Sequence, residues 1–196
     1  MSHAISDEAL DRIFRTARSQ NKWQDKPVSP ALLMAVYDLM RWGPTSANVS
    51  PARFVFLVSQ ESKERLKPFL MPTNVNKVMT SPATAIIGYD LDFPELIPKL
   101  FPHNPGAKDW FQDPKLRETT AFRNGTLQGA YFIVAARALG LDCGPMSGFN
   151  NEGVDKEFFS GTNIKSNFIC AVGYGDPSGV MARSPRLSFD EACKIL

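Results

Sequence analysis

One stretch joins the chain's first long helical pattern to its first strand pattern, and it reads Arg41-Trp42-Gly43-Pro44-Thr45-Ser46-Ala47-Asn48-Val49-Ser50-Pro51-Ala52-Arg53. Gly43 and Pro44 end the helix, because glycine commonly closes a helix and proline cannot continue one. Three short polar side chains follow on a turn: Thr45, Ser46 and Asn48. Hydroxyls, an amide and free backbone N–H groups on a turn suit a polar ligand, although the same residues are typical of a plain helix–loop–strand connection.

Two helical patterns lie upstream of this stretch. In the first, Ser6 is the expected N-cap, and an apolar stripe continues to Ala17. In the second, Ser29 and Pro30 open a helix whose apolar face extends to Met40.

The segment between these two helices begins with Arg18-Ser19-Gln20-Asn21. A cation, a hydroxyl and an amide within four residues are able to bind a phosphate. The alternative is a solvated helix end, at which Arg18 complements the helix dipole.

The regular pattern downstream predicts buried strands and short helices. The strands are expected at 54–58, 83–89 and 167–174, the helices at 61–70, 74–80 and 154–159, and a final turn at 188–195. The longest helical pattern runs from Leu116 to Leu139, and its second half is apolar all round, which predicts a central helix buried on every side. Asn124 and Gln128 share a face of its first half, where a buried amide needs partners from the surrounding protein or from a ligand.

Residues 90–115 form the least regular part of a chain that we expect to be a single domain over 1–196. Five prolines and four aromatic residues fall within this segment, which is typical of an excursion covering a site or a neighbouring subunit. His103 lies within it, either as a donor to a substrate oxygen or as a structural or exposed side chain.

Two later segments carry further candidate residues. Leu141 to Phe149 predicts a short strand that leads into a tight turn at Gly144-Pro145, where the backbone can approach a flat ligand closely. Arg183 and Arg186 lie in a proline-containing loop near the end of the chain. Two such arginines are able to clamp a phosphate, or they are merely solvated.

Composition narrows the class of protein. The chain has 196 residues, with 43% hydrophobic and 21% charged residues and a net charge of +2, which fits one globular domain and argues against nucleic-acid binding. No run of 18 apolar residues exists, and the first residues lack the pattern of a signal peptide. Three cysteines without CxxC spacing and two histidines indicate neither a disulfide framework nor a metal centre. We therefore expect a cytoplasmic location, with no membrane and no metal.

Taken in order, these segments resemble the FMN-dependent nitroreductase family over nearly the whole chain. Within it they are most similar to the malonic semialdehyde reductases of pyrimidine degradation. The resemblance is carried by Arg18-Ser19-x-Asn21, 42–48, 50–53, 100–103, 120–124, 137–142, 144–149 and 185–189.

The resemblance implies an α+β fold with a central mixed β-sheet flanked by helices, in an intertwined homodimer with FMN at the subunit interface. Arg18, Ser19 and Asn21 would hold the FMN phosphate and ribityl chain, and Arg183 and Arg186 would complete the phosphate clamp. The remaining residues fall into three groups: Pro44, Thr45, Ser46 and Asn48 from the other subunit; Asn74 and Asn124 at polar atoms of the flavin; and Pro145, Met146, Ser147 and Gly148 on the ring face.

The sequence departs from the family pattern at two places. Ala17 precedes Arg18 and Asn21 stands where a cation is usual, while Ser147 stands where many members have glutamate. Both departures make the expected pocket less charged and leave individual phosphate contacts open.

The implied activity is hydride transfer from NADH or NADPH, through flavin N5, to a small electrophile such as malonic semialdehyde. His103 and Arg123 are candidate substrate contacts, since a carbonyl acceptor needs a nearby donor. The alternatives are a broad nitroaromatic or quinone reductase and a non-catalytic flavin carrier. No motif for reading the ribose is visible, so the sequence does not choose between NADH and NADPH.

Overall fold

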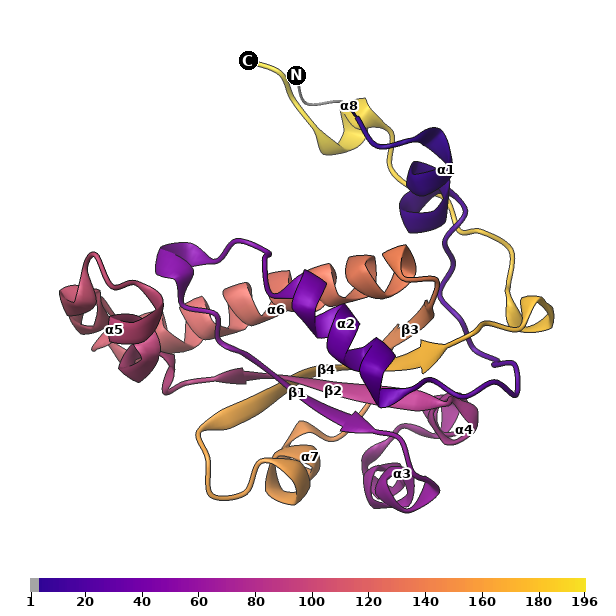
Figure 1. The fold of residues 1–196 in the computed structure, drawn as a ribbon, viewed down its shortest axis with the longest axis horizontal. Helices are drawn as coiled ribbons and strands as arrows, with labels where there is room; N and C mark the ends of the chain where they lie inside the picture. The colour runs from indigo at the N-terminus through magenta and orange to yellow at the C-terminus, as the bar shows by residue number, and fades with distance from the viewer. Residues whose placement is uncertain (1–3) are drawn as a thin grey trace.

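The computed structural model describes residues 4–196 and contains one four-stranded sheet with helices on both faces (Figure 1). The strands are β1 (Ala52–Leu57), β2 (Ala83–Asp90), β3 (Asp142–Met146) and β4 (Ile164–Gly173), in the spatial order β1-β2-β4-β3. All three strand pairs are antiparallel. The helix-flanked α+β fold is thus confirmed, while the parallel pairing expected of a mixed sheet is confined, in residues 4–196, to one isolated bridge between Ser19 and Cys143.

The α-helices of residues 4–196 are α1 (Asp7–Leu10), α2 (Pro30–Met40), α3 (Gln60–Leu66), α4 (Pro72–Thr80), α5 (Ile97–Leu100), α6 (Pro114–Ala138), α7 (Asn151–Phe158) and α8 (Phe189–Ala192). The two N-caps that the sequence predicts, Ser6 and Ser29, are confirmed. The hydroxyl of Ser6 accepts from the backbone N–H of Ala9, and that of Ser29 accepts from Leu32. Capping satisfies backbone donors that a helix leaves unpaired at its start.

Two local predictions were wrong. The first helix does not continue as α-helix to Ala17, because the chain widens into a π-helical turn at Asp11–Arg15. Gly144 and Pro145 lie inside β3 rather than in a turn after it. Proline is tolerated there because β3 is the last strand of the sheet order and pairs with β4 alone among the named strands.

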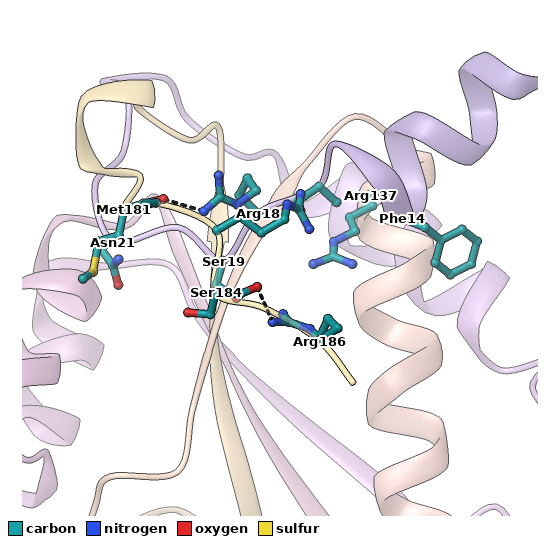
Figure 2. Close-up of a pocket in the computed structure, with 11 residues that line it drawn as sticks. Phe14, Arg18, Ser19, Asn21, Arg137, Met181, Ser184 and Arg186 are labelled. Atoms are coloured by element: carbon teal, nitrogen blue, oxygen red, sulfur yellow. Dashed lines mark hydrogen bonds between the residues drawn. The ribbon is translucent and has the colours of Figure 1, made fainter. Parts of the chain in front are cut away.

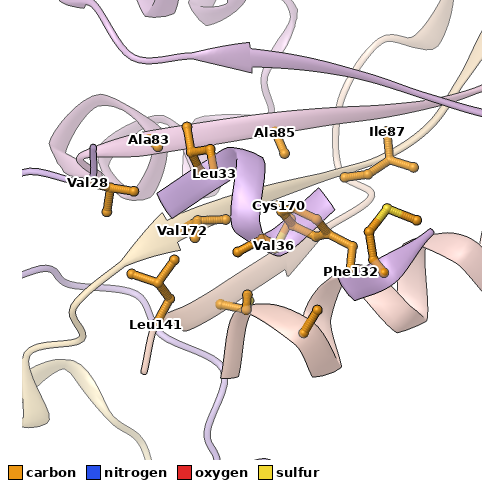
Figure 3. Close-up of a cluster of buried hydrophobic side chains, with 14 residues drawn as sticks. Val28, Leu33, Val36, Ala83, Ala85, Ile87, Phe132, Leu141, Cys170 and Val172 are labelled. Atoms are coloured by element: carbon orange, nitrogen blue, oxygen red, sulfur yellow. The ribbon is translucent and has the colours of Figure 1, made fainter. Parts of the chain in front are cut away.

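The core has two layers, one on each face of the sheet. Helices α2 and α6 cover one face, and Figure 3 shows Val36, Ile87 and Phe132 meeting between them and the strands. Helices α3, α4 and α7 cover the other face, over Ile86 and Ile169. Because β2 is covered on both faces, its residues are almost all buried, as its apolar run predicts.

The expectation that the second half of α6 is buried on every side was wrong for the single chain. Phe132 and Ala136 are fully buried, but Leu127 is 46% exposed and Tyr131 is 41% exposed. Helix α2 exposes Met34 at 68%. The layer of α2 and α6 therefore has an inner face on the sheet and an outer face that carries large apolar side chains.

Residues 90–115 form short helical turns rather than a structureless loop. They comprise a 3₁₀ turn at Phe93–Leu96, α5, and a second 3₁₀ segment at Pro105–Phe111. Phe93, Ile97 and Phe111 pack with Val49, so this excursion carries a small core of its own. Within residues 4–196 no helix is long and apolar enough to cross a membrane.

Candidate functional site

The main candidate site is a cavity of about 500 Å³ at the C-terminal end of α6 (Figure 2). It is lined by Phe14, Ala17, Arg18, Ser19, Asn21, Arg137, Met181, Ala182, Arg183, Ser184 and Arg186. The fold thus brings Arg18, Ser19 and Asn21 together with Arg183 and Arg186, from opposite ends of the sequence.

Backbone contacts fix the two segments that form the cavity. The bridge between Ser19 and Cys143, with the Gln20 N–H donating to the Cys143 carbonyl at 3.0 Å, attaches the first segment to β3. The Arg183 guanidinium donates to the carbonyls of Arg15 at 2.9 Å and Ala17 at 3.1 Å, which ties the tail to the first segment. The first segment is therefore held by main-chain hydrogen bonds, and the tail is held by the Arg183 side chain on main-chain carbonyls.

The cavity carries an unbalanced positive charge. Four of its lining residues are arginines and none is an acid. Among the described residues, Arg18, Arg137, Arg183 and Arg186 form no ion pair with a carboxylate. Because a guanidinium has five N–H donors and matches oxyanions bidentately, this arrangement is suited to a phosphate.

Sequence reasoning missed Arg137. The signal was present, since Arg137 lies in the last turn of the longest helix, next to the strand whose first residues bridge to Ser19. Its guanidinium also donates to the Ile13 carbonyl at 3.1 Å, so it joins α6 to the wall of the cavity.

A second group of predicted residues lies at the end of β3. The side-chain amide of Asn74 donates to the Gly148 carbonyl at 3.0 Å, so the structure brings Asn74 to the segment Pro145–Gly148. A Cβ on Gly144 would lie 2.5 Å from the Gln20 carbonyl oxygen and 3.1 Å from Lys77 Cδ. Burial lowers the pKa of Lys77. Gln20, which lies between Ser19 and Asn21 of the arginine cavity in the sequence, thus contacts the strand that leads to this second group.

The third group, Pro44 to Asn48, occupies a strained loop. Ala47, Asn48 and Ser50 have φ of 47°, 50° and 38°, although none is glycine. The Asn48 side chain donates to the Leu100 carbonyl at 2.7 Å, and the Ser50 N–H donates to the Thr45 hydroxyl at 3.2 Å. Such non-glycine conformations cost energy and persist only where the surroundings enforce them, as they commonly do at binding sites.

Asn124 holds this loop rather than facing open space. Its side-chain oxygen accepts from the Ser46 N–H at 2.9 Å, and its NH₂ donates to the Thr120 carbonyl at 2.8 Å. The residue is buried. The surrounding protein thus supplies partners for both the oxygen and the nitrogen of the Asn124 amide, which gives Asn124 a positioning role, while its predicted contact with the flavin stays a prediction.

The strained loop and the arginine cavity lie at different places along α6. The loop contacts α6 at Asn124, whereas Arg137 lines the cavity. These residues are thirteen positions apart, which is about 20 Å along a helix. One chain therefore does not assemble all the residues that the sequence predicts for one site.

The two candidate substrate contacts are also remote from the arginine cavity. His103 is exposed and packs edge-on against Phe101, with ring centroids 4.1 Å apart. Arg123 is exposed on α6, next to Asn124. Both lie on the same part of the molecule as the strained loop.

Comparison with known proteins identifies the class. The model of the nitroreductase family matches residues 6–175. The chain belongs to the nitroreductase family and is therefore an enzyme of the oxidoreductase class.

Two relatives cover essentially the whole chain. One, from Cupriavidus pinatubonensis, is 60% identical over 193 residues, covering 97% of this chain and 98% of the relative. Another, from Stenotrophomonas maltophilia, is 60% identical over 196 residues, covering all of both chains. Both are provisionally named NADH dehydrogenase/NAD(P)H nitroreductases.

Solved structures agree on the fold. A protein from Exiguobacterium sibiricum, provisionally named a nitroreductase and determined in complex with FMN, has a TM-score of 0.87 at 17% identity, and the match covers all of both chains. A protein from Bacillus subtilis with the same provisional name has a TM-score of 0.84 at 20% identity, covering 97% of this chain and all of that one.

Proposed function

We propose that this chain is an FMN-dependent NAD(P)H oxidoreductase that acts as a homodimer. The observation that carries the proposal is the cavity in which four arginines meet with no acidic residue. A phosphate monoester brings close to two negative charges at neutral pH, which such a cavity neutralises. The FMN complex of the structural neighbour and the names of the two relatives support the same cofactors.

The residues present fit FMN beyond its phosphate. Gly144 and Gly148 allow other segments to pack closely on the end of β3, since a Cβ on Gly144 would lie 2.5 Å from the Gln20 carbonyl oxygen and one on Gly148 would lie 2.8 Å from the Asn74 amide nitrogen. This packing holds Asn74 and the segment next to the arginine cavity beside Pro145, Met146 and Ser147, where the ring of FMN would lie. Bound FMN supplies the capacity to take a hydride from NADH or NADPH and to pass it on.

In this proposal the protein binds and orients rather than reacts. Arg18, Ser19 and Asn21 hold the phosphate and ribityl chain together with Arg183 and Arg186, and Arg137 adds a further charge. Asn74 presents its amide to polar atoms of the ring. With Asn21 and Ser147 in place of charged residues, the charge of the site is concentrated on the arginines at the phosphate end.

A homodimer completes the site. The loop that carries Pro44, Thr45, Ser46 and Asn48 contacts α6 at Asn124. Asn124 lies about 20 Å along the helix from Arg137, which lines the cavity of the same chain. A two-fold pairing through the outer face of α6 carries the loop of one subunit to the cavity of the other. The exposed apolar side chains of Leu127 and Tyr131 support this interface, since monomers rarely expose contiguous apolar patches of such residues.

The acceptor that we propose is malonic semialdehyde, reduced to 3-hydroxypropionate in pyrimidine degradation in the cytoplasm. The resemblance of 42–48, 100–103 and 144–149 to that group supports it. His103 and Arg123, on the part of the chain that would face the partner's flavin, are the candidate donors to the carbonyl oxygen. The excursion at 90–115 would cover this site within a single domain.

The first test is retention of FMN. Arg183→Ala combined with Arg186→Ala should raise the FMN dissociation constant at least about a hundredfold, because each charge-assisted contact contributes about 1.5–3 kcal/mol. Isothermal titration of the apoprotein measures it. Arg65→Ala, which removes an exposed ion pair with Glu157, is the matched control and should leave FMN affinity unchanged. Full retention in the double variant would refute the phosphate clamp.

The second test identifies the acceptor. FMN-loaded protein is reduced anaerobically with NADH or NADPH and mixed in a stopped-flow instrument with malonic semialdehyde, a quinone or a nitroarene. Fast reoxidation by the aldehyde supports the proposed acceptor, and fast reoxidation only by the quinone or nitroarene favours the broad reductase. A yellow protein that neither NADH nor NADPH bleaches would instead be a flavin carrier.

A further inference from the structure

A second cavity, of about 560 Å³, lies beside the strained loop. Its lining includes Pro44 and Asn48, which are predicted to face the partner's flavin, and the cations Arg41, Arg53 and Lys99. No carboxylate residue lines it. We call it the Lys99 pocket.

The Lys99 pocket is lined by cations without acids, although the chain as a whole is nearly neutral. The chain carries 22 basic and 20 acidic residues, so the two signs are nearly balanced over the sequence as a whole. Three other cavities do contain acids, namely Asp25, Asp38, and Glu152 with Asp155. Among these cavities of the described chain, only the arginine cavity and the Lys99 pocket combine several cations with no acid. The Lys99 pocket is thus a second place built for an anion.

The three cations differ in how far the protein already uses them. Arg53 donates to the Asp90 carboxylate at 2.7 Å and to the carbonyls of Ser50 and Ala52, so it forms a fixed wall. Arg41 lies 3.6 Å from the Asp38 carboxylate, and both side chains are more than half exposed, so that pair is weak. Within the residues that the structure describes, Lys99 forms no ion pair.

Lys99 is nevertheless placed relative to the loop. It lies in α5, and the next residue, Leu100, accepts a hydrogen bond from the Asn48 side chain at 2.7 Å. The left-handed backbone of Asn48 is thus coupled to the position of Lys99.

We propose that the Lys99 pocket binds the carboxylate of a small anionic acceptor, with Lys99 and Arg41 as the side chains that select it. The proposal rests on the proposed function, because Pro44 and Asn48 join the pocket to the flavin of the partner. An acceptor such as a short aldehyde acid presents a carboxylate a few bonds from its carbonyl. Two cations on one side of the site bind that carboxylate and direct the carbonyl away from them. A neutral quinone or nitroarene gains nothing from these charges.

The test compares an anionic with a neutral aldehyde of the same chain length. For the FMN-loaded dimer, Lys99→Met should lower kcat/KM for malonic semialdehyde about tenfold and leave that for propanal unchanged, because a hydrogen bond to a charged group contributes roughly 1.5–3 kcal/mol. Methionine keeps the length of the side chain, and Lys99→Arg should restore most of the loss. Lys108→Met, an exposed lysine of the same excursion outside the pocket, is the matched control.

A binding measurement separates this proposal from the proposed function. Malonate titrated into the oxidised holoenzyme should perturb the flavin absorbance, with a dissociation constant raised about tenfold in Lys99→Met. Lys99-dependent malonate binding without aldehyde reduction would support the pocket while refuting malonic semialdehyde as acceptor. Equal losses for both aldehydes, no Lys99-dependent malonate binding, or a loss confined to reduction by NADH or NADPH would overturn the proposal. The last result would assign the cations to the coenzyme diphosphate.

Discussion

The C-terminal end and the middle of α6 border two cation-lined cavities that are built in different ways. At the C-terminal end, Arg18 and Arg183 are anchored by hydrogen bonds to main-chain carbonyls. Near the N-terminal half, the wall is a loop with three left-handed non-glycine residues, held by the buried amide of Asn124. A rigid anchor suits a cofactor that stays bound, so the arginine cavity is where we propose that the phosphate of FMN binds. In the same proposal the strained loop faces the ligands that exchange.

The largest effect is expected from separating the two subunits, because we propose that the loop of one subunit meets the arginine cavity of the other. Leu127→Glu combined with Tyr131→Glu would bury four carboxylates in a two-fold interface, so we expect the dimer to dissociate at micromolar concentration. FMN affinity should fall with it, although no arginine is altered. Sedimentation velocity and FMN titration measure the two effects.

Thr119→Glu, an exposed change on the same helix, is the control for adding charge to α6. If the double variant stays dimeric, the interface lies elsewhere. If it becomes a monomer that binds FMN as tightly as the parent, one chain suffices for the site.

A smaller but still large effect is expected at the arginine end from Gly144→Ala. The added Cβ would lie 2.5 Å from the Gln20 backbone oxygen, so the first segment has to shift. We expect a loss of about 1–3 kcal/mol in the free energy of unfolding and weaker FMN binding. Urea denaturation measures the first. Gly106→Ala meets no atom closer than 3.8 Å and should be neutral; equal behaviour of the two variants would show that the close packing at Gly144 is unimportant.

At the loop end, Asn124→Ala leaves the Ser46 N–H without its acceptor. The expected cost is about 0.5–1.5 kcal/mol in the free energy of unfolding, because this hydrogen bond is only partly buried and water can reach the freed N–H. Acceptor turnover should fall, while FMN affinity changes less than in the arginine variants. Thr119→Ala controls for the helix. If Asn124→Ala loses FMN as severely as the arginine double variant, the loop and the arginine cavity do not act separately.

The smallest effect concerns pH. Burial lowers the pKa of Lys77 below its usual 10.5, so the unfolded chain binds more protons in the window between the two pKa values. Stability contributed by this group therefore rises as pH increases toward 10.5. Lys77→Met should flatten that rise in urea midpoints measured from pH 8 to 10.5, whereas Lys108→Met should not. An unchanged slope in Lys77→Met would show that Lys77 is fully solvated in the native state.

Local patterns were sufficient for most of the fold. Apolar runs predict β1, β2 and β4, and Ser29-Pro30 predicts the start of α2, because burial and capping depend on neighbours in the chain. The same reliance on near neighbours led to the wrong prediction that Gly144-Pro145 forms a turn. Glycine and proline favour turns locally, but the edge position of β3 is a property of the whole sheet.

The site, like the fold, was only partly predictable from the sequence. The sequence alone determined which residue types were available: a cation with a hydroxyl at Arg18-Ser19, a polar turn at Thr45-Ser46, and a late pair of arginines. Only the tertiary structure decided that Arg137 joins those arginines and that Asn124 holds the loop. It alone decided that Lys99 lies beside Asn48. Composition and periodicity act between near neighbours, whereas an excess of charge in a cavity arises from segments that meet only when the sheet and its helices have packed.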